Sequence, residues 1–172
     1  MNHLIIEGFI GSGKGAAARA AAKKLGLSVI DIDKMISERL KMTVGEIYDR
    51  YGEKFYRAME TVMLDELLEQ KEQSVIVLGS GVAMMPQNAP YLKKLGHVYY
   101  IHMKQDDVVR NMRNSEKHKW IHDDGWEEQV ARLYKEREPA YKKTADCIIE
   151  GKGLSAAAIA DRIVEEEQKS RS

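Results

Sequence analysis

The chain has 172 residues with 27 basic and 27 acidic side chains, so it has no overall charge that would favour nucleic acid or an anionic membrane. This length fits a single domain, which we assign to residues 1–172. The single cysteine, Cys147, excludes an intramolecular disulfide and is typical of a reducing compartment. The first residues lack a signal peptide's basic and apolar regions, and no stretch reaches the roughly 20 apolar residues of a membrane span. We therefore expect a cytoplasmic monomer that binds neither nucleic acid nor membranes.

Short apolar runs alternate with longer amphipathic stretches, which is typical of βαβ units around a parallel sheet. The predicted strands are Leu4–Glu7, Ser28–Asp31, Ser74–Leu78, His97–His102 and Cys147–Glu150. A long helix is predicted over residues 43–70, opening on the capping box Thr43-x-x-Glu46 and broken near Gly52. Further helices are predicted after residue 13, after Asp33, over 126–146 and after the N-cap Ser155.

Residues 8–15, GFIGSGKG, are similar to the phosphate-binding loop G-x-x-x-x-G-K-[ST]. The motif follows a predicted strand and opens a predicted helix, so backbone N–H groups, Lys14 and the helix N-terminus would face one anion. The expected ATP-binding residues are Gly11, Ser12, Gly13, Lys14, Gly15 and Ala16. A glycine-rich turn with an incidental lysine is the alternative. The motif predicts an α/β fold of the P-loop NTPase type, with three α/β/α layers, a five-stranded parallel sheet and a lid loop.

The residues after Lys14 depart from this motif, because Gly15 and Ala16 lack the hydroxyl that would touch magnesium. Mg²⁺ keeps several waters, so we expect its binding to be weakened or re-routed. The second predicted strand ends near Asp31 and Asp33, at the sheet edge where α/β proteins bind ligands. Asp31 is the candidate Mg²⁺ ligand, acting through water, and Asp33 is the candidate acceptor of a hydrogen bond from a substrate hydroxyl. Alternatively, or in addition, Asp33 caps the helix that follows.

Five segments, in order and spacing, resemble the shikimate kinase family over about residues 3–168. They are the phosphate loop, the D-x-D of residues 31–33, YGEKFYRAME, VIVLGSGVAM and REPAYKKTADCII. The most specific piece follows the family pattern G-E-x-x-F-R-x-x-E, with Gly52, Glu53, Arg57 and Glu60 in place and Tyr56 before the arginine. A second piece matches R-x-P-x-Y at Arg137, Pro139 and Tyr141.

The resemblance implies a kinase that uses ATP and Mg²⁺ to phosphorylate the 3-hydroxyl of shikimate, in aromatic amino acid biosynthesis. Lys14 would hold the β- and γ-phosphates, and Asp33 would orient or deprotonate the hydroxyl. Arg57 and Arg137 would clamp the shikimate carboxylate, which suits the planar arginine side chain. The acceptor would bind in a helical region at about residues 33–61. The family's glycine triplet, here Gly79, Ser80 and Gly81, would also contact the substrate.

A charged segment at about residues 114–125 is predicted to form the lid. The family's lid arginine has no match there, and Lys119 is the nearest cationic substitute, so it is the third catalytic candidate beside Lys14 and Asp33. Arg110 fits the family's adenine-stacking position, with an ordinary surface charge as the alternative.

Several alternatives to this interpretation stay open. Arg57 could instead have a structural role, in an ion pair with Glu53 or Glu60 on its own helix. Arg137 could instead be a solvated charge on the surface of its helix. The acceptor has rivals in a nucleoside monophosphate and a sugar acid. The departures in the phosphate loop, the glycine triplet and the lid also leave a nucleotide-binding protein with little catalysis as a hypothesis.

Overall fold

A five-stranded parallel sheet forms the centre of the fold, as predicted. The structure, a computed structural model, describes residues 2–114 and 124–172. The strands are β1 (His3–Glu7), β2 (Ser28–Asp31), β3 (Ser74–Val77), β4 (Gly96–His102) and β5 (Cys147–Glu150). They lie in the order β2-β3-β1-β4-β5, with every neighbouring pair parallel. The predicted strands are confirmed to within one residue at each end.

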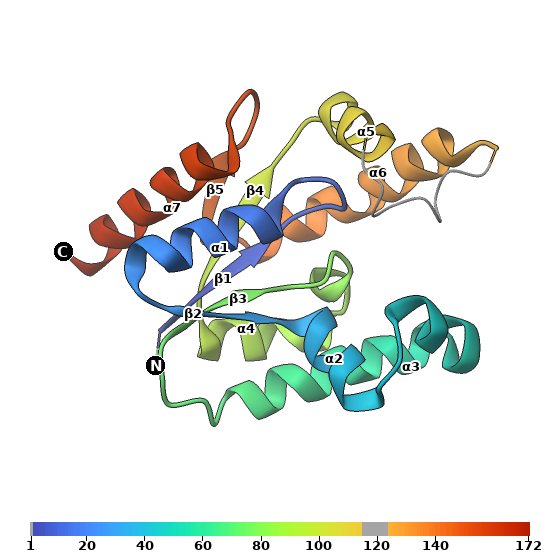
Figure 1. Cartoon of the computed structure of the whole chain (residues 1–172), viewed down its shortest axis with the longest axis horizontal. Helices are drawn as coiled ribbons and strands as arrows, with labels where there is room; N and C mark the ends of the chain where they lie inside the picture. Colours follow the sequence, from blue (N-terminus) through green and yellow to red (C-terminus); the bar gives the residue numbers. More distant parts are fainter. Residues whose placement is uncertain (1, 115–123) are drawn as a thin grey trace.

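Helices cover both faces of this sheet, which confirms the three-layer α/β/α architecture (Figure 1). The helices are α1 (Lys14–Leu25), α2 (Ile32–Leu40), α3 (Val44–Leu67), α4 (Ala89–Leu95), α5 (Gln105–Arg113), α6 (Trp126–Thr144) and α7 (Ala156–Arg171), with short 3-10 turns η1 (Val82–Met84) and η2 (Pro86–Asn88). Helices α1 and α7 lie side by side on one face, and α3 and α4 pack on the other. Among the residues that the structure describes, no helix combines the length and apolar character needed to cross a membrane.

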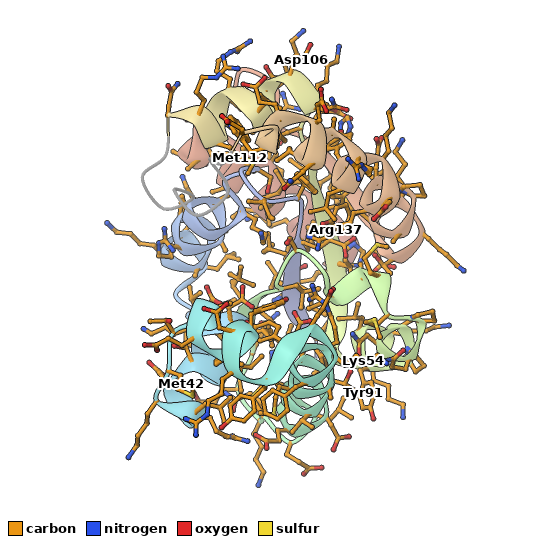
Figure 2. All side chains as sticks on the ribbon, turned by 90° about the vertical axis from the view of Figure 1, so that its right-hand side faces the viewer. Met42, Lys54, Tyr91, Asp106, Met112 and Arg137 are labelled. Carbon is orange, nitrogen blue, oxygen red and sulfur yellow. The ribbon has the colours of Figure 1, made fainter. Side chains whose placement is uncertain are left out.

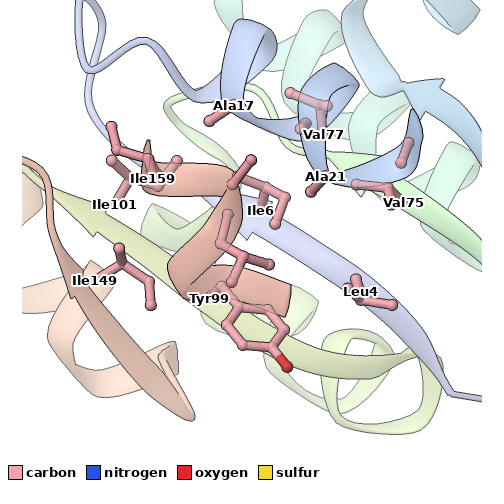
Figure 3. Packing of buried hydrophobic residues seen from close by; sticks show 14 residues of the cluster. Leu4, Ile6, Ala17, Ala21, Val75, Val77, Tyr99, Ile101, Ile149 and Ile159 are labelled. Carbon is pink, nitrogen blue, oxygen red and sulfur yellow. The ribbon is translucent and has the colours of Figure 1, made fainter. Parts of the chain in front are cut away.

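Alternation along the strands divides the core between the two faces. Leu4 and Ile6 of β1 face α1 and α7, whereas Ile5 between them packs with residues of α3 and α4. Figure 3 shows the first of these clusters, in which Ala17 and Ala21 of α1 lie against the sheet. Small alanine side chains let α1 approach the sheet closely, which fixes the loop at its N-terminus above the strand ends.

Helix α3 has both local features that the sequence predicts. Thr43 and Glu46 form a reciprocal capping box, with the Glu46 N–H donating to Thr43 Oγ1 at 3.2 Å and the Thr43 N–H donating to Glu46 Oε2 at 2.7 Å. Gly52 interrupts the helix at φ 83° and ψ 173°, a backbone conformation that glycine adopts readily. The resulting bend separates the first turns of α3 from the long segment that carries Arg57.

The start of α2 corrects one expectation about the two aspartates. The helix begins at Ile32, and Asp31 is its N-cap, with Oδ1 accepting a hydrogen bond from the Lys34 N–H at 3.2 Å. Asp33 lies in the first helical turn, so the alternative in which Asp33 is the N-cap is wrong. The helix begins two residues earlier than that alternative requires.

A buried carboxyl group joins the end of β1 to α6. Glu7 is 1% exposed, and Thr144 Oγ1 lies 2.8 and 2.9 Å from its two carboxyl oxygens. Burial raises the pKa of Glu7 to about 8, with the hydrogen bond from Thr144 opposing this shift and the charge of Asp146 adding to it. Glu7 directly precedes the phosphate loop, so this contact connects the loop's supporting strand to the helix that carries Arg137.

Replacing Glu7 by glutamine should change how stability depends on pH. The native pKa of about 8 lies above the ordinary value of 4.5, so the folded protein binds this proton more tightly and loses stability as pH rises between these values. The free energy of unfolding of Glu7→Gln, relative to that of the wild type, should therefore increase as the pH rises between the two pKa values. The increase is at most about 1.4 kcal/mol per unit of pKa difference. Urea denaturation from pH 4 to pH 9 measures it, with exposed Glu128→Gln as the control. A stability difference between Glu7→Gln and the wild type that does not change with pH would contradict the raised pKa of Glu7.

Candidate active site

One cavity of about 1380 Å³ lies where the carboxyl ends of β1, β2 and β3 meet the flanking helices. Its walls come from the phosphate loop, the start of α2, the first half of α3, the segment after β3, and α6. In Figure 2, Arg137 lies near the centre of the molecule, between α5 and α6 above and α2 and α3 below. Segments far apart in the sequence therefore line one space, at the sheet edge that the sequence indicates.

The phosphate loop has the backbone that its glycines allow. Gly11 and Gly13 have φ values of 80° and 76°, in the left-handed region that favours glycine. Gly8 is needed for a different reason: a Cβ there would lie 2.7 Å from Ser12 Oγ and 3.1 Å from the Ile101 carbonyl oxygen. The loop is thus shaped partly by backbone conformation and partly by close packing.

The N-terminus of α1 opens onto the cavity without an acidic residue in its own first turn. Gly13 caps the helix with no side-chain hydrogen bond, and the first turn contains no acidic residue. Gly11, Gly13, Lys14, Gly15 and Ala16 all line the cavity. Unpaired N–H groups at a helix N-terminus, together with a lysine, are well suited to bind phosphate groups. These residues therefore fit a nucleoside triphosphate.

Two other residues that the sequence assigns to the nucleotide site are not among the described residues that line the cavity. Ser12 is 1% exposed, and its N–H donates to the Phe9 carbonyl at 3.1 Å, so it lies outside the set of described residues that line the cavity. Arg110 is exposed, lies 3.3 Å from Asp107 and is likewise outside that set. The next residue, Asn111, lines the cavity and donates from Nδ2 to the Gly11 carbonyl at 2.9 Å.

Charged groups from three elements influence one another in the cavity. Burial lowers the pKa of Lys14, while the charges of Asp33 and Asp31 raise it. Burial raises the pKa of Asp33, which a hydrogen bond from Tyr56 and the charge of Lys14 oppose. The structure thus places Lys14, Asp31 and Asp33 together, as the sequence indicates.

Arg57 takes part in ion pairs on its own helix and also lines the cavity. Its Nη1 lies 2.5 Å from Glu60 Oε1, and its Nε lies 3.5 Å from Glu53 Oε1. Both pairs of the structural alternative therefore exist, and they leave the guanidinium at the cavity wall. Glu60 is 0% exposed, and its Oε2 has no hydrogen-bond partner among the described residues. Burial raises the pKa of Glu60 to about 7, opposed by Arg57.

The segment after β3 has room for a side chain only at its middle position. A Cβ at Gly79 would lie 2.7 Å from Glu60 Oε2, and one at Gly81 would overlap the Arg57 guanidinium. Ser80 between them lines the cavity, and its Oγ accepts a hydrogen bond from Arg137 Nη1 at 2.7 Å. The serine thus adds a contact to an arginine of the site without displacing Arg57.

Arg137 is a buried charge, which rules out the alternative of a solvated helix arginine. It is 8% exposed and lines the cavity from α6. Tyr141, one turn later on α6, donates its hydroxyl hydrogen to the Ser80 carbonyl and ties the helix to the same segment. A buried guanidinium is costly unless it is paired, so this position favours an anionic ligand.

The residues present offer limited ligation for Mg²⁺. Within residues 2–114 and 124–172, no three His, Cys, Asp or Glu side chains gather closely enough to hold a metal ion. Asp31 and Asp33 both line the cavity, and the N-cap bond of Asp31 uses only Oδ1. Mg²⁺ is commonly bound by one or two carboxylates, substrate phosphates and water, so these groups fit that mode and no all-protein site.

Part of the predicted site lies outside the described residues, and part of the cavity lining was not predicted. Residues 115–123, which include Lys119 and most of the expected lid, are outside the described residues. Sequence analysis missed Arg19, Tyr48 and Asn111, which all line the cavity. The sequence does contain an indication of Arg19, because this residue is an isolated charge among alanines on the helix that follows the loop.

Comparison with known proteins gives a consistent result. The family model "Shikimate kinase" matches residues 10–168. The shikimate kinase of Thermodesulfovibrio yellowstonii is 29% identical, covering 98% of this chain and 96% of the relative. That of Thermoanaerobacter pseudethanolicus is 30% identical, covering 95% of each. The solved shikimate kinase from Acinetobacter baumannii in complex with shikimate has a TM-score of 0.90 at 25% identity, covering 99% of this chain and 95% of that one.

These matches confirm the family resemblance of the motifs over nearly the whole chain. The fold and the sequence agree, since the same family gives both the model match and the solved structure. The protein therefore belongs to the shikimate kinase family and is an ATP-dependent kinase.

Proposed function

We propose that this protein transfers the γ-phosphoryl group of ATP to the 3-hydroxyl of shikimate. The observation that carries the proposal is that the phosphate loop, the buried Arg137 and the partly buried Arg57 line one cavity, with Asp33 between the loop and the arginines in the charge network. A phosphate site and a carboxylate site in one cavity suit a kinase whose acceptor is a small hydroxylated acid. Family membership and the relatives named above support the same acceptor.

The phosphate loop would bind the triphosphate. Gly11, Gly13 and Gly15 would donate backbone N–H groups, and Lys14 would add a full positive charge near the β- and γ-phosphates. Asp31 would hold Mg²⁺ through water, and the ion, when bound, would neutralise charge on the phosphates. The absent hydroxyl at Gly15 means that this chain relies on water and Asp31 where the usual motif supplies a side chain.

The acceptor would bind on the opposite side of the cavity. Arg57 and Arg137 would hold its carboxylate, and Asp33 would orient or deprotonate the hydroxyl that attacks the γ-phosphate. Gly79, Ser80 and Gly81 would form the adjoining wall. Catalysis would come mainly from positioning and from stabilising charge that develops on the transferred group.

Other expectations from the sequence stay predictions. These include three residue roles. Ser12 would be part of the nucleotide site, Arg110 would contact the adenine, and Lys119 of the lid would stabilise charge on the transferred phosphoryl group. The single domain over residues 1–172, the monomeric state and the cytoplasmic location, which the single cysteine supports, also stay predictions.

A different small acid, such as a sugar acid, is the second candidate acceptor. Ser80 favours it, because the serine hydroxyl engages Arg137 and changes the shape of the wall beside the expected carboxylate position. A nucleoside monophosphate fits less well, since two arginines that line the cavity beside Asp33 suit a hydroxylated carboxylate better than a base.

A coupled assay of ADP formation tests the main proposal directly. We expect turnover with ATP, magnesium and shikimate, and much less with gluconate or nucleoside monophosphates. Lys14→Ala should lower kcat/KM about 100-fold or more with every acceptor, because it removes a charge from the phosphates. Lys152→Ala, outside the cavity, is the control. Tight ATP binding without turnover on shikimate would exclude this acceptor and favour the rival functions.

Arg137 and Ser80 should affect the acceptor rather than the nucleotide. Arg137→Ala removes half of the carboxylate clamp, so we expect the acceptor KM to rise about 100-fold while the ATP KM changes little. Ser80→Ala removes only the bond that orients Arg137, and should raise the acceptor KM about threefold. Lys135→Ala, an exposed position on α6, is the control. Unchanged acceptor kinetics in Arg137→Ala would show that the clamp assignment is wrong.

Restoring a hydroxyl after Lys14 tests the magnesium argument. A Cβ at Gly15 would lie 3.3 Å from Nη1 of Arg19, the mobile end of an exposed side chain, so a serine has room. Gly15→Ser should lower the magnesium concentration needed for half-maximal rate about threefold, because a ligand is gained. Gly15→Ala is the matched control for bulk. An unchanged requirement would indicate that Asp31 and water already suffice.

A further inference from the structure

The hydroxyl of Tyr56 contacts the carboxylate of Asp33. Tyr56 is 2% exposed, and its O–H donates a hydrogen bond to Asp33 Oδ1. The Tyr56 ring packs against Tyr48, with ring centroids 4.7 Å apart and planes at 31°. Tight packing of the ring fixes the position of the hydroxyl, so the hydrogen-bond donor is held in place by the core.

Gly79 packs against the Asp33 carboxylate on another side. A Cβ at Gly79 would lie 2.9 Å from Asp33 Oδ1 and 3.4 Å from Oδ2, so the carboxylate lies over the bare Cα of this glycine. The contact with Tyr56 uses Oδ1, and among the described residues no side chain or backbone group donates to Oδ2. One oxygen is therefore held by the protein while the other stays available in the cavity that Asp33 lines.

The charges around this pair keep the phenol a donor. Burial raises the pKa of Tyr56, and the carboxylates of Asp33 and Glu60 raise it further. Asp33 also faces Lys14 from α1, Asp31 from the N-cap of α2, and Arg57 and Glu60 from α3, the helix of Tyr56 itself. The tyrosine hydroxyl is the neighbour that donates a hydrogen bond to this carboxylate.

We propose that Tyr56 is a positioning residue, whose hydroxyl holds the Asp33 carboxylate in one orientation so that Oδ2 meets the acceptor hydroxyl. The inference rests on the proposed function, since it takes Asp33 as the group that this hydroxyl meets. A phenylalanine at this position would keep the packing with Tyr48 and leave Asp33 free to rotate. The tyrosine therefore adds rigidity to the reacting group, which positioned catalysis requires.

Tyr56→Phe tests the proposal, because it removes one oxygen atom and keeps the ring. With ATP and shikimate we expect kcat to fall about 10-fold, while both KM values stay within about twofold. In an Asp33→Asn background, Tyr56→Phe should cause no further loss, because the hydroxyl acts through Asp33. A loss of folded protein would lower the rate in both backgrounds, so the double variant separates positioning from folding.

Tyr99→Phe is the matched control. The Tyr99 hydroxyl donates to Glu167 Oε2 at 2.6 Å, which is a second buried contact between a tyrosine and a carboxylate, between β4 and α7 and away from the cavity. This variant should lower the melting temperature without changing kcat. An equal fall in kcat in Tyr99→Phe would mean that loss of any buried tyrosine hydroxyl has this effect, and would overturn the proposal.

Crystal structures of the wild type and Tyr56→Phe give a readout that does not depend on the acceptor. Asp33 should face Gly79 in the wild type and be rotated or spread over several orientations in the variant. A kcat within twofold of wild type, an equal loss in the Asp33→Asn background, or an unmoved Asp33 would each overturn the inference. If the wild type fails to phosphorylate shikimate, the proposed function fails, and the orientation of Asp33 still decides the positioning role.

Discussion

The buried ion pair between Arg57 and Glu60 is the contact around which the acceptor side of the cavity is arranged. Glu60 is inaccessible to solvent, and a charge in that position needs a partner. Room for the pair exists because residues 79 and 81 carry no side chain, since a Cβ at either would collide with Glu60 or Arg57. The glycines are therefore a steric requirement of the charges, and only Ser80 is free to vary.

Two hydroxyl groups, those of Ser80 and Tyr56, form hydrogen bonds with charged groups of the site. Ser80 accepts a hydrogen bond from Arg137, and Tyr56 donates one to Asp33. Both change how a charged side chain is held and leave the charge itself in place. A charge-assisted hydrogen bond is stronger than a neutral one, so these contacts restrict orientation at the groups where orientation controls binding and rate. The loss of a hydroxyl after Lys14 belongs to the opposite side of the cavity, where water can replace a ligand.

The two sides of the cavity are connected through the sheet and α6. Glu7 lies at the end of β1, one residue before the phosphate loop, and accepts a hydrogen bond from Thr144 near the end of α6. The same helix carries Arg137 and Tyr141, which contact Ser80 after β3. One helix thus spans from the strand beneath the nucleotide site to the wall of the acceptor site, and it fixes their separation.

Local pattern in the sequence determined the strands, the alanine-rich helix, the capping box at Thr43 and the break at Gly52, because each depends on neighbouring residues only. The motifs also identified the phosphate loop and the arginines, and the family that the comparisons confirm. Tertiary structure alone decided that Arg19 and Asn111 reach the cavity and that Arg137 is buried. It also joined Tyr56 to Asp33, Ser80 to Arg137 and Glu7 to Thr144. These contacts link residues 23, 57 and 137 positions apart, so they follow from strand order and helix packing, which no local pattern encodes.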